Sequence, residues 1–236
     1  MLRRFGQRST LAFVLVLALA LLPVAGIVRA WQDAEIFSPA SGHAQVIAQG
    51  VGELPSNAVW RVVFHSVAPG TPAALPAGGA GFLLTDTGGV VATINGQETL
   101  LAPAEAAFVD EADVSLTAVG NRAAGVFTVE TVPADQASDA GTGIAVFASD
   151  PFAAPAGTRD LDLVRDRLEP GESTTVVGAQ APVLVLVTLG AVSAQAADGT
   201  TADLQVGEAT TLNGDVVITA AGQAPATFVA AVIGRE

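Results

Sequence analysis

Side chains that could carry acid–base or metal chemistry are scarce in this chain. It has 236 residues, with two histidines, no cysteine and no tyrosine. His43 lies in a segment without periodicity, whereas His65 lies on an expected strand that turns Val63 and Val67 to the same face. The sequence supplies no ligand near either histidine, so we expect each to be a surface or hydrogen-bonded residue. Ser66 beside His65 does not indicate a hydrolase, because the chain has no Gly-x-Ser-x-Gly turn.

An acidic turn is a second candidate site. Asp110, Glu111 and Asp113 could supply the oxygen ligands that calcium prefers. Their spacing matches no defined calcium loop, and a solvated loop in an acidic protein is the simpler interpretation.

A third candidate is the segment 159–169 (RDLDLVRDRLE), which carries charges of both signs at strand spacing. Cross-strand ion pairs on a solvent-exposed face would explain this pattern. A binding role for Arg165 and Arg167 is the alternative, because arginine is scarce elsewhere in the chain.

The first thirty residues have the pattern of an export signal. Three arginines stand within the first eight residues, residues 11–26 are almost wholly apolar, and Val28 and Ala30 are small residues at the positions that a signal peptidase reads. We expect a signal-peptide helix that is cleaved after Ala30. An uncleaved membrane anchor is the alternative, and residues 11–28 would then contact the membrane. Either interpretation places the remaining chain outside the cytoplasm, secreted or in the cell envelope.

The charge of the remaining chain excludes one class of partner. Without residues 1–30 it has 6 arginines, no lysine and 23 acidic residues, a net charge of −17. A domain this acidic repels phosphate backbones, so no nucleic acid is expected to bind. Since the chain has no cysteine, disulfides are excluded and packing alone must stabilise the fold.

Beyond residue 30 the pattern indicates β-structure. Residues 31–45 show no clear period and are interpreted as a linker. Short runs rich in Val and Leu then alternate with turn residues, and no long helical period occurs. Asn95-Gly96 and Asp198-Gly199 each separate two such runs and predict hairpins. The sequence predicts an all-β protein with strands near 60–67, 81–85, 90–94, 99–101, 125–132, 183–189, 210–212, 216–219 and 227–233.

The chain also repeats itself at a spacing of about a hundred residues. The matching pairs lie at offsets of 101 to 103 and are Pro69-Gly70 with Pro170-Gly171, Gly89 with Gly190, Asn95-Gly96 with Asp198-Gly199, and Phe127 with Phe228. Composition alone would not keep turns and strand ends in step in this way. We therefore expect two homologous units, 46–135 and 144–236, joined by a linker at 136–143.

The order of these motifs resembles the cupin family in both units. A strand, Pro-Gly, a strand, Gly, a strand, an Asn-Gly or Asp-Gly turn and then Leu-x-x-x-Glu-Ala follow one another. The resemblance implies two tandem jelly-roll β-barrels, a bicupin-like arrangement. It also implies where metal ligands would stand, because metal-binding cupins place His-x-His and a Glu in a first motif and another His in a second. Counted from the Pro-Gly turns, these positions fall near Pro76, Gly78, Phe82 and Ser115 in the first unit and near Val177, Ala179, Val183 and Ile218 in the second.

None of these positions holds a histidine or a carboxylate, so neither barrel is expected to bind a transition metal or any other cofactor. A polar hole would leave buried groups unsatisfied, and filling it with side chains is the stable alternative. Strand 183–189 is apolar on both faces, which indicates a covering partner on its outer side, the other barrel or a second chain in a dimer. The residues expected inside the barrels are Phe82, Leu84, Val183, Val185 and Val187.

The function expected from these observations is that of an exported, non-catalytic cupin-like protein that binds a protein partner or a small apolar ligand. Two alternatives stay open at this point. One is a metal-free cupin enzyme of the isomerase or epimerase type, which would need a His or Tyr in the barrel mouth. The other is a purely structural surface module.

Overall fold

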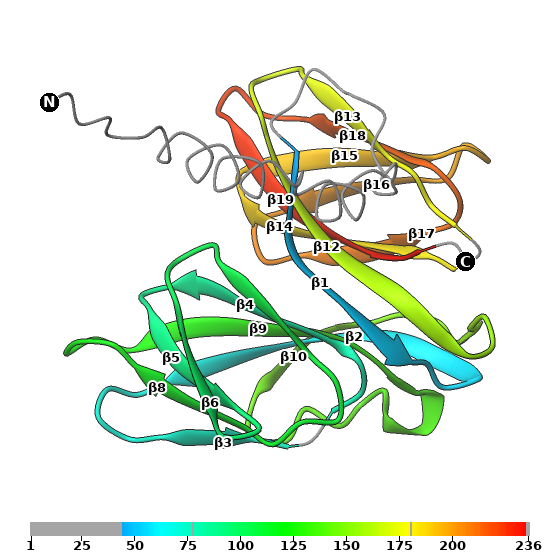
Figure 1. Cartoon of the computed structure of the whole chain (residues 1–236). Coiled ribbons are helices and arrows are strands. Elements are labelled where there is room, and N and C mark those ends of the chain that lie inside the picture. Colours follow the sequence, from blue (N-terminus) through cyan, green and yellow to red (C-terminus); the bar gives the residue numbers. More distant parts are fainter. Residues whose placement is uncertain (1–43, 77, 180, 235–236) are drawn as a thin grey trace, which may run out of the picture. The chain divides into compact units, whose positions relative to one another are not determined.

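A computed structural model describes residues 44–76, 78–179 and 181–234 (Figure 1). The strands are β1(Gln45–Glu53), β2(Asn57–Val67), β3(Ala73–Leu75), β4(Gly81–Thr87), β5(Val90–Ile94), β6(Gln97–Leu101), β7(Ala106–Val109), β8(Val114–Ala118), β9(Ala124–Pro133), β10(Ile144–Ala148), β11(Phe152–Ala153), β12(Thr158–Leu168), β13(Ser173–Val176), β14(Val183–Leu189), β15(Ala191–Ala196), β16(Thr201–Gln205), β17(Ala209–Leu212), β18(Val216–Ala220) and β19(Ala226–Ile233). One short 3-10 helix, η2 (Ala134–Gln136), is the only helical element in these ranges.

The all-β prediction is confirmed for the described residues. His43 and the expected signal-peptide helix lie outside them. Within them, no helix is long and apolar enough to cross a membrane.

Sheet pairing divides the described strands into two barrels. The first barrel combines the sheet β10-β2-β9-β4-β7, with β11 on β2, and the sheet β3-β8-β5-β6. The second combines β1-β12-β19-β14-β17 and β13-β18-β15-β16. Each barrel has its own apolar core, that of the first around Leu83 and Leu116 and that of the second around Val185 and Ile218.

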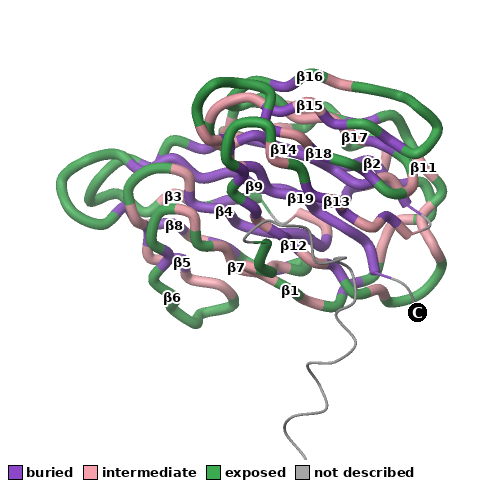
Figure 2. Tube along the Cα trace, turned by 90° about the horizontal axis from the view of Figure 1, so that it is seen from above, coloured by how far each residue is buried: buried purple, intermediate pink, exposed green. Residues whose placement is uncertain are grey.

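The two larger sheets pack face to face and bury a third core between them. Trp60, Phe82 and Leu161 belong to this inter-sheet core, in which side chains from both barrels interlock. The indole Nε1 of Trp60 donates a hydrogen bond of 2.8 Å to the carbonyl oxygen of Pro182. The central strands β9 and β19 are accordingly buried along almost their whole length (Figure 2).

Strands cross between the barrels at both chain connections. β1 pairs with β12, so Gln45–Glu53 extends a sheet of the second barrel. β10 and β11, which follow the linker, pair instead with β2 of the first barrel. Hydrogen bonds thus cross the unit boundaries drawn from the sequence repeat, and they tie each barrel to the chain of the other.

The predicted hairpins have the backbone that their turn residues favour. Asn95 and Gly96 both have positive φ, 49° and 78°, as a type I′ turn between β5 and β6 requires. At the second turn only Gly199 is positive, at 88°, and the amide of Thr200 donates to Oδ1 of Asp198.

The register of β4 corrects one expectation from the sequence. The side chains of Phe82 and Leu84 belong to the inter-sheet core, whereas Leu83 between them faces the core of the first barrel. In the second barrel, Val183, Val185 and Val187 do lie in the barrel core.

The physical reason is one extra residue in the second unit, between its Pro-Gly turn and β14. The Pro-Gly turns of the two units are 101 residues apart. The glycines with positive φ at the ends of β4 and β14, Gly88 and Gly190, are 102 residues apart. A slip of one residue turns every side chain of a strand to the opposite face.

Candidate binding site in the first barrel

The interior of the first barrel contains charged and polar side chains on two adjacent strands. Along β2, Arg61 and His65 face inward with Val63, and along β9, Thr128 and Glu130 do the same. Their outward neighbours are apolar residues of the inter-sheet core, such as Trp60 and Val129. The alternation of strands therefore separates one apolar face from one polar face.

Arg61 and Glu130 stand directly opposite each other in the β2–β9 register and form an ion pair. Nε and Nη2 of Arg61 both donate to Oε1 of Glu130, at 3.1 and 2.9 Å. Nη1 donates to the carbonyl oxygen of Gln136 at 2.8 Å, so the last residue of η2 is held beside the first barrel. The two residues are only 6% and 7% exposed, and a buried pair of this kind needs such hydrogen bonds to offset its desolvation.

The other carboxylate oxygen of Glu130, Oε2, makes no hydrogen bond to any described residue. It lies beside Gly78, where an added Cβ would collide with it. Burial raises the pKa of Glu130, attraction to Arg61 opposes that rise, and repulsion by Asp139 adds to it. The site thus contains a carboxylate oxygen with hydrogen-bonding capacity to spare.

His65 is buried at 6% exposure, with Nε2 3.4 Å from Oγ1 of Thr128. Burial, and secondarily the positive charge of Arg61, lower its pKa, so the imidazole is neutral at pH 7. Gly143 packs against the ring, since a Cβ there would lie 2.9 Å from Nδ1. We expected His65 to be a surface or a hydrogen-bonded residue, and the structure shows that it is buried and hydrogen-bonded.

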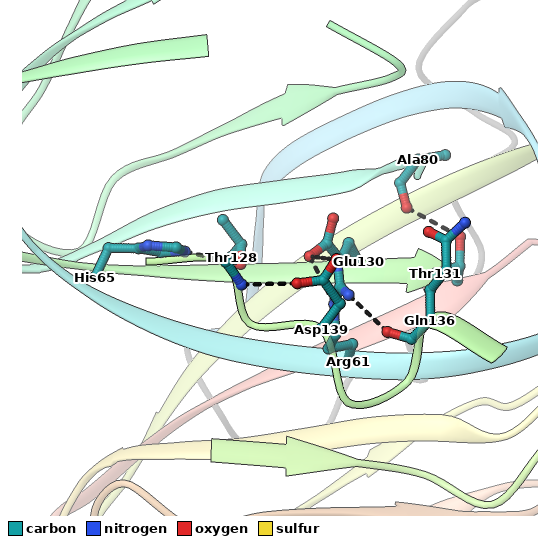
Figure 3. Close-up of polar contacts among 9 residues, drawn as sticks. Arg61, His65, Ala80, Thr128, Glu130, Thr131, Gln136 and Asp139 are labelled. Carbon is teal, nitrogen blue, oxygen red and sulfur yellow. Dashed lines mark hydrogen bonds and ion pairs between the residues drawn. The ribbon is translucent and has the colours of Figure 1, made fainter. Parts of the chain in front are cut away.

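These side chains border a cavity that is partly open to solvent. Figure 3 shows the polar cluster of His65, Thr128, Glu130, Arg61 and Asp139 at this place. The apolar part of the lining comes from Leu75, Leu83, Val109 and Val114, and the segment after η2 contributes Asp139 and Ala140. Binding pockets commonly combine an apolar wall with a few convergent polar groups in this way.

Three of the four positions that the resemblance marked in the first unit are found at this cavity. Pro76, Gly78 and Phe82 line it, whereas Ser115 on β8 does not. The corresponding positions of the second barrel are apolar, and Val183 and Ile218 lie in its packed core. Among the described residues, no three His, Cys, Asp or Glu side chains are grouped so that they could hold a metal ion. A metal-free protein stays a prediction.

The acidic turn lies at the cavity, and within the described chain its carboxylates are not grouped as a metal site would require. Glu111 lines the cavity with a positive φ of 43°. Burial raises the pKa of Asp110, and repulsion by Glu111 and Glu53 raises it further. Asp113 is an exposed residue whose amide donates to Oδ1 of Asn95.

The arginines of segment 159–169 have structural contacts. Nη1 of Arg165 donates to the carbonyl oxygen of Ala104 at 2.7 Å, which links β12 to a turn of the first barrel. Arg167 is exposed, and its Nη2 lies 3.5 Å from Oε1 of Glu169.

Sequence reasoning missed Arg61, Thr128 and Glu130 altogether. The signal was available, because two strands that are otherwise apolar each carry one charge, of opposite sign. A charge on an apolar strand needs a partner directly across the sheet. The counts from the Pro-Gly turns directed attention to the β3–β4 connection, β4 and β8 instead, and three of the four positions lie on another wall of the same cavity.

Comparisons with known proteins concern the fold. No family model matches the sequence, and no curated protein matches it. Among solved structures, YhaK from Escherichia coli is similar with a TM-score of 0.54 and 11% identity, covering 82% of this chain and 94% of that one. A formate complex of oxalate decarboxylase from Lactobacillus farciminis has a TM-score of 0.52 and 10% identity, covering 83% and 84%.

Procruciferin, an 11S globulin from Brassica napus, is also similar, with a TM-score of 0.51 and 8% identity, covering 80% of this chain and 84% of that one. Structural neighbours of the chain, the oxalate decarboxylase among them, are cupin-fold proteins. Two jelly-roll barrels packed sheet to sheet are therefore the cupin fold in its double form, as the sequence motifs had indicated.

Proposed function

We propose that the chain is a small-molecule-binding protein of the cupin fold and that the cavity of the first barrel is its binding site. The observation that carries this proposal is the contrast between the barrel interiors. The second has a core of valines and other apolar side chains, with Asp166 and Thr174 as buried polar residues, whereas the first keeps a cavity beside the buried Arg61–Glu130 pair. Buried polar groups beside open space are typical of sites where a ligand supplies the missing contacts.

Blocking the cavity tests this function. Ala140 lines the cavity and is half-buried, so Ala140→Trp places an indole at the opening. Ala137 lies in the same segment, is equally half-buried and does not line the cavity, which makes Ala137→Trp the matched control. Ligand-observed NMR with a panel of small amines, alcohols and carboxylates should detect binding to the natural protein and to Ala137→Trp. Binding that Ala140→Trp leaves unchanged, or no binding by any compound, would contradict the proposal.

A metal-free enzyme is the second candidate, because a specific observation favours it. A buried carboxyl whose pKa is raised and a neutral histidine line the same cavity, and such a pair can exchange protons with a bound molecule. Incubation of each bound compound in D₂O would reveal such chemistry as deuterium incorporation at carbon. Incorporation that is lost in Glu130→Gln would support the enzyme, and binding without incorporation supports the non-catalytic function.

We also propose that the protein works outside the cytoplasm, on the evidence of the basic start and apolar run in residues 1–30. N-terminal sequencing of the native protein should give Trp31 as the first residue. An intact Met1 in the membrane fraction would indicate the anchor instead, and a cytosolic pool would contradict export.

A further inference from the structure

The charges around the cavity are unbalanced, and this bears on what can bind. The lining contains one cation, Arg61, and three acidic residues, Glu111, Glu130 and Asp139. Oε1 of Glu130 already accepts two hydrogen bonds from Arg61, so the positive charge is matched within the barrel. His65 adds no charge because burial keeps it neutral. Two carboxylates therefore remain without a cation at the cavity.

Asp139, one of these two carboxylates, lies near Glu130 at the cavity (Figure 3). Burial is the main cause of the raised pKa of Glu130, and repulsion by Asp139 adds to it. Oδ1 of Asp139 accepts a hydrogen bond from the amide of Gly141 at 3.0 Å, which holds its carboxylate in place at the mouth. Oε2 of Glu130 has no hydrogen-bond partner among the described residues. A cation between these two carboxylates would convert their repulsion into two attractions.

The rest of the lining is apolar, and this restricts the cation further. Leu75, Leu83 and Val114 form part of the wall. A bare metal ion would need several converging oxygen or nitrogen ligands, and no such group exists among the described residues. An organic ammonium needs only one or two acceptors for its N–H groups and can place a hydrocarbon body against the apolar wall.

We propose that the cavity of the first barrel selects a small organic amine, whose ammonium group lies between Glu130 and Asp139 and whose apolar body contacts Leu75, Leu83 and Val114. The proposal rests on the binding function proposed above and specifies the ligand class of that same site. An anion is disfavoured, because it would meet two unmatched carboxylates within a chain whose net charge beyond residue 30 is −17. Gly78 belongs to the same arrangement, since any side chain there would collide with Oε2 of Glu130.

Three probes of equal size and different charge test the proposal: benzylamine, benzyl alcohol and benzoate. Calorimetry at pH 7 should show benzylamine binding at least about tenfold more tightly than benzyl alcohol, because a charge-assisted hydrogen bond is about twice as strong as a neutral one. Benzoate should not bind. Benzyl alcohol or benzoate binding as tightly as the amine would overturn the assignment of the ligand class.

Two variants locate the ammonium group. Asp139→Asn, at an exposed position where folding is not at risk, should weaken benzylamine by about threefold and leave benzyl alcohol unchanged. Glu130→Gln should weaken it by tenfold or more. Asp203→Asn on β16 of the second barrel removes the same charge from an exposed site and should change nothing. Equal losses in Asp139→Asn and Asp203→Asn would show that only the overall charge acts and would contradict the proposed position.

The same experiments separate this proposal from the binding function on which it rests. If carboxylates or alcohols bind in a manner that Ala140→Trp abolishes, the cavity is a binding site and the amine assignment is wrong. If no compound binds in that manner, both proposals fail.

Discussion

The first barrel and the second barrel have the same strand order and different interiors. β4 and β14 even show the same pattern of buried and exposed residues from end to end. Yet the opposed pair Arg61 and Glu130 of β2 and β9 is matched by Asp162 and Val232 on β12 and β19. The inward Thr128 is likewise matched by Ala230.

The faces that the barrels turn toward each other differ much less. Trp60 corresponds to Leu161, and Phe82 corresponds to Leu184, and all four residues lie fully buried in the inter-sheet core. The shared apolar face therefore stabilises both barrels, so that one interior can contain a buried ion pair and a cavity without loss of the fold.

The largest loss of stability is expected from a truncation in the inter-sheet core, which both barrels share. Phe82→Ala removes a fully buried ring from the inter-sheet core and should lower the free energy of unfolding by about 4 kcal/mol, as measured by urea denaturation. Hydrogen exchange should then rise in β14 and β19 of the second barrel as well as in β4. Leu83→Ala, which empties the core of the first barrel only, should leave exchange in β14 and β19 unchanged. If Phe82→Ala loosens the first barrel alone, its ring does not hold the two sheets together.

The neighbours Phe82 and Leu83 also show what could be predicted from the sequence. Turn residues and apolar runs predicted the strands, because these patterns are local. The double barrel was predicted from the repeat of the motifs and from their resemblance to cupins. The side-chain direction predicted for β4 was wrong because one inserted residue reverses the two faces of a strand. Counting over a hundred residues cannot show where such an insertion lies. The Arg61–Glu130 contact was missed because the two residues are 69 positions apart in the sequence. Only the register of β2 with β9 brings their charges together.

The next largest loss of stability is expected when the buried ion pair inside the first barrel is broken. Glu130→Ala leaves the guanidinium of Arg61 buried with no opposite charge in contact, and should lower the free energy of unfolding by about 3 kcal/mol. Glu98→Ala, an exposed acid on β6, removes the same charge and should stay within about 0.5 kcal/mol of the natural protein. A loss no greater than that of the control would mean that Arg61 finds another partner or reaches solvent.

Making the first barrel resemble the second should restore stability and remove binding. The double variant Arg61→Met, Glu130→Leu replaces the buried pair with apolar side chains, and such replacements are commonly neutral or stabilising. We expect unfolding free energy within about 1 kcal/mol of the natural protein and no detectable binding of benzylamine. Retained binding would place the ligand elsewhere, and a loss as large as that of Glu130→Ala would show that the pair itself is needed for the fold.

The smallest effect expected is on the pH dependence of stability. His65 and Glu130 of the first barrel change the free energy of unfolding in opposite directions as the pH falls. The pKa of His65 is lowered from 6.5, so the unfolded chain binds the proton more readily and stability falls as the pH drops below 6.5. The pKa of Glu130 is raised from 4.5, so the folded chain binds the proton more readily and stability rises as the pH falls toward 4.5. His65→Gln, which keeps a polar group near Thr128, removes the first dependence and leaves the second.

Urea denaturation between pH 7 and pH 5 should therefore show the variant gaining stability relative to the natural protein as the pH falls. The difference in slope cannot exceed about 1.4 kcal/mol per pH unit, because one proton is involved. The second barrel has Asp166 on β12 at the position of His65, so no histidine of that barrel contributes to the dependence. Parallel curves for the two proteins would mean that His65 titrates alike in the folded and unfolded chain, which is incompatible with its burial beside Arg61.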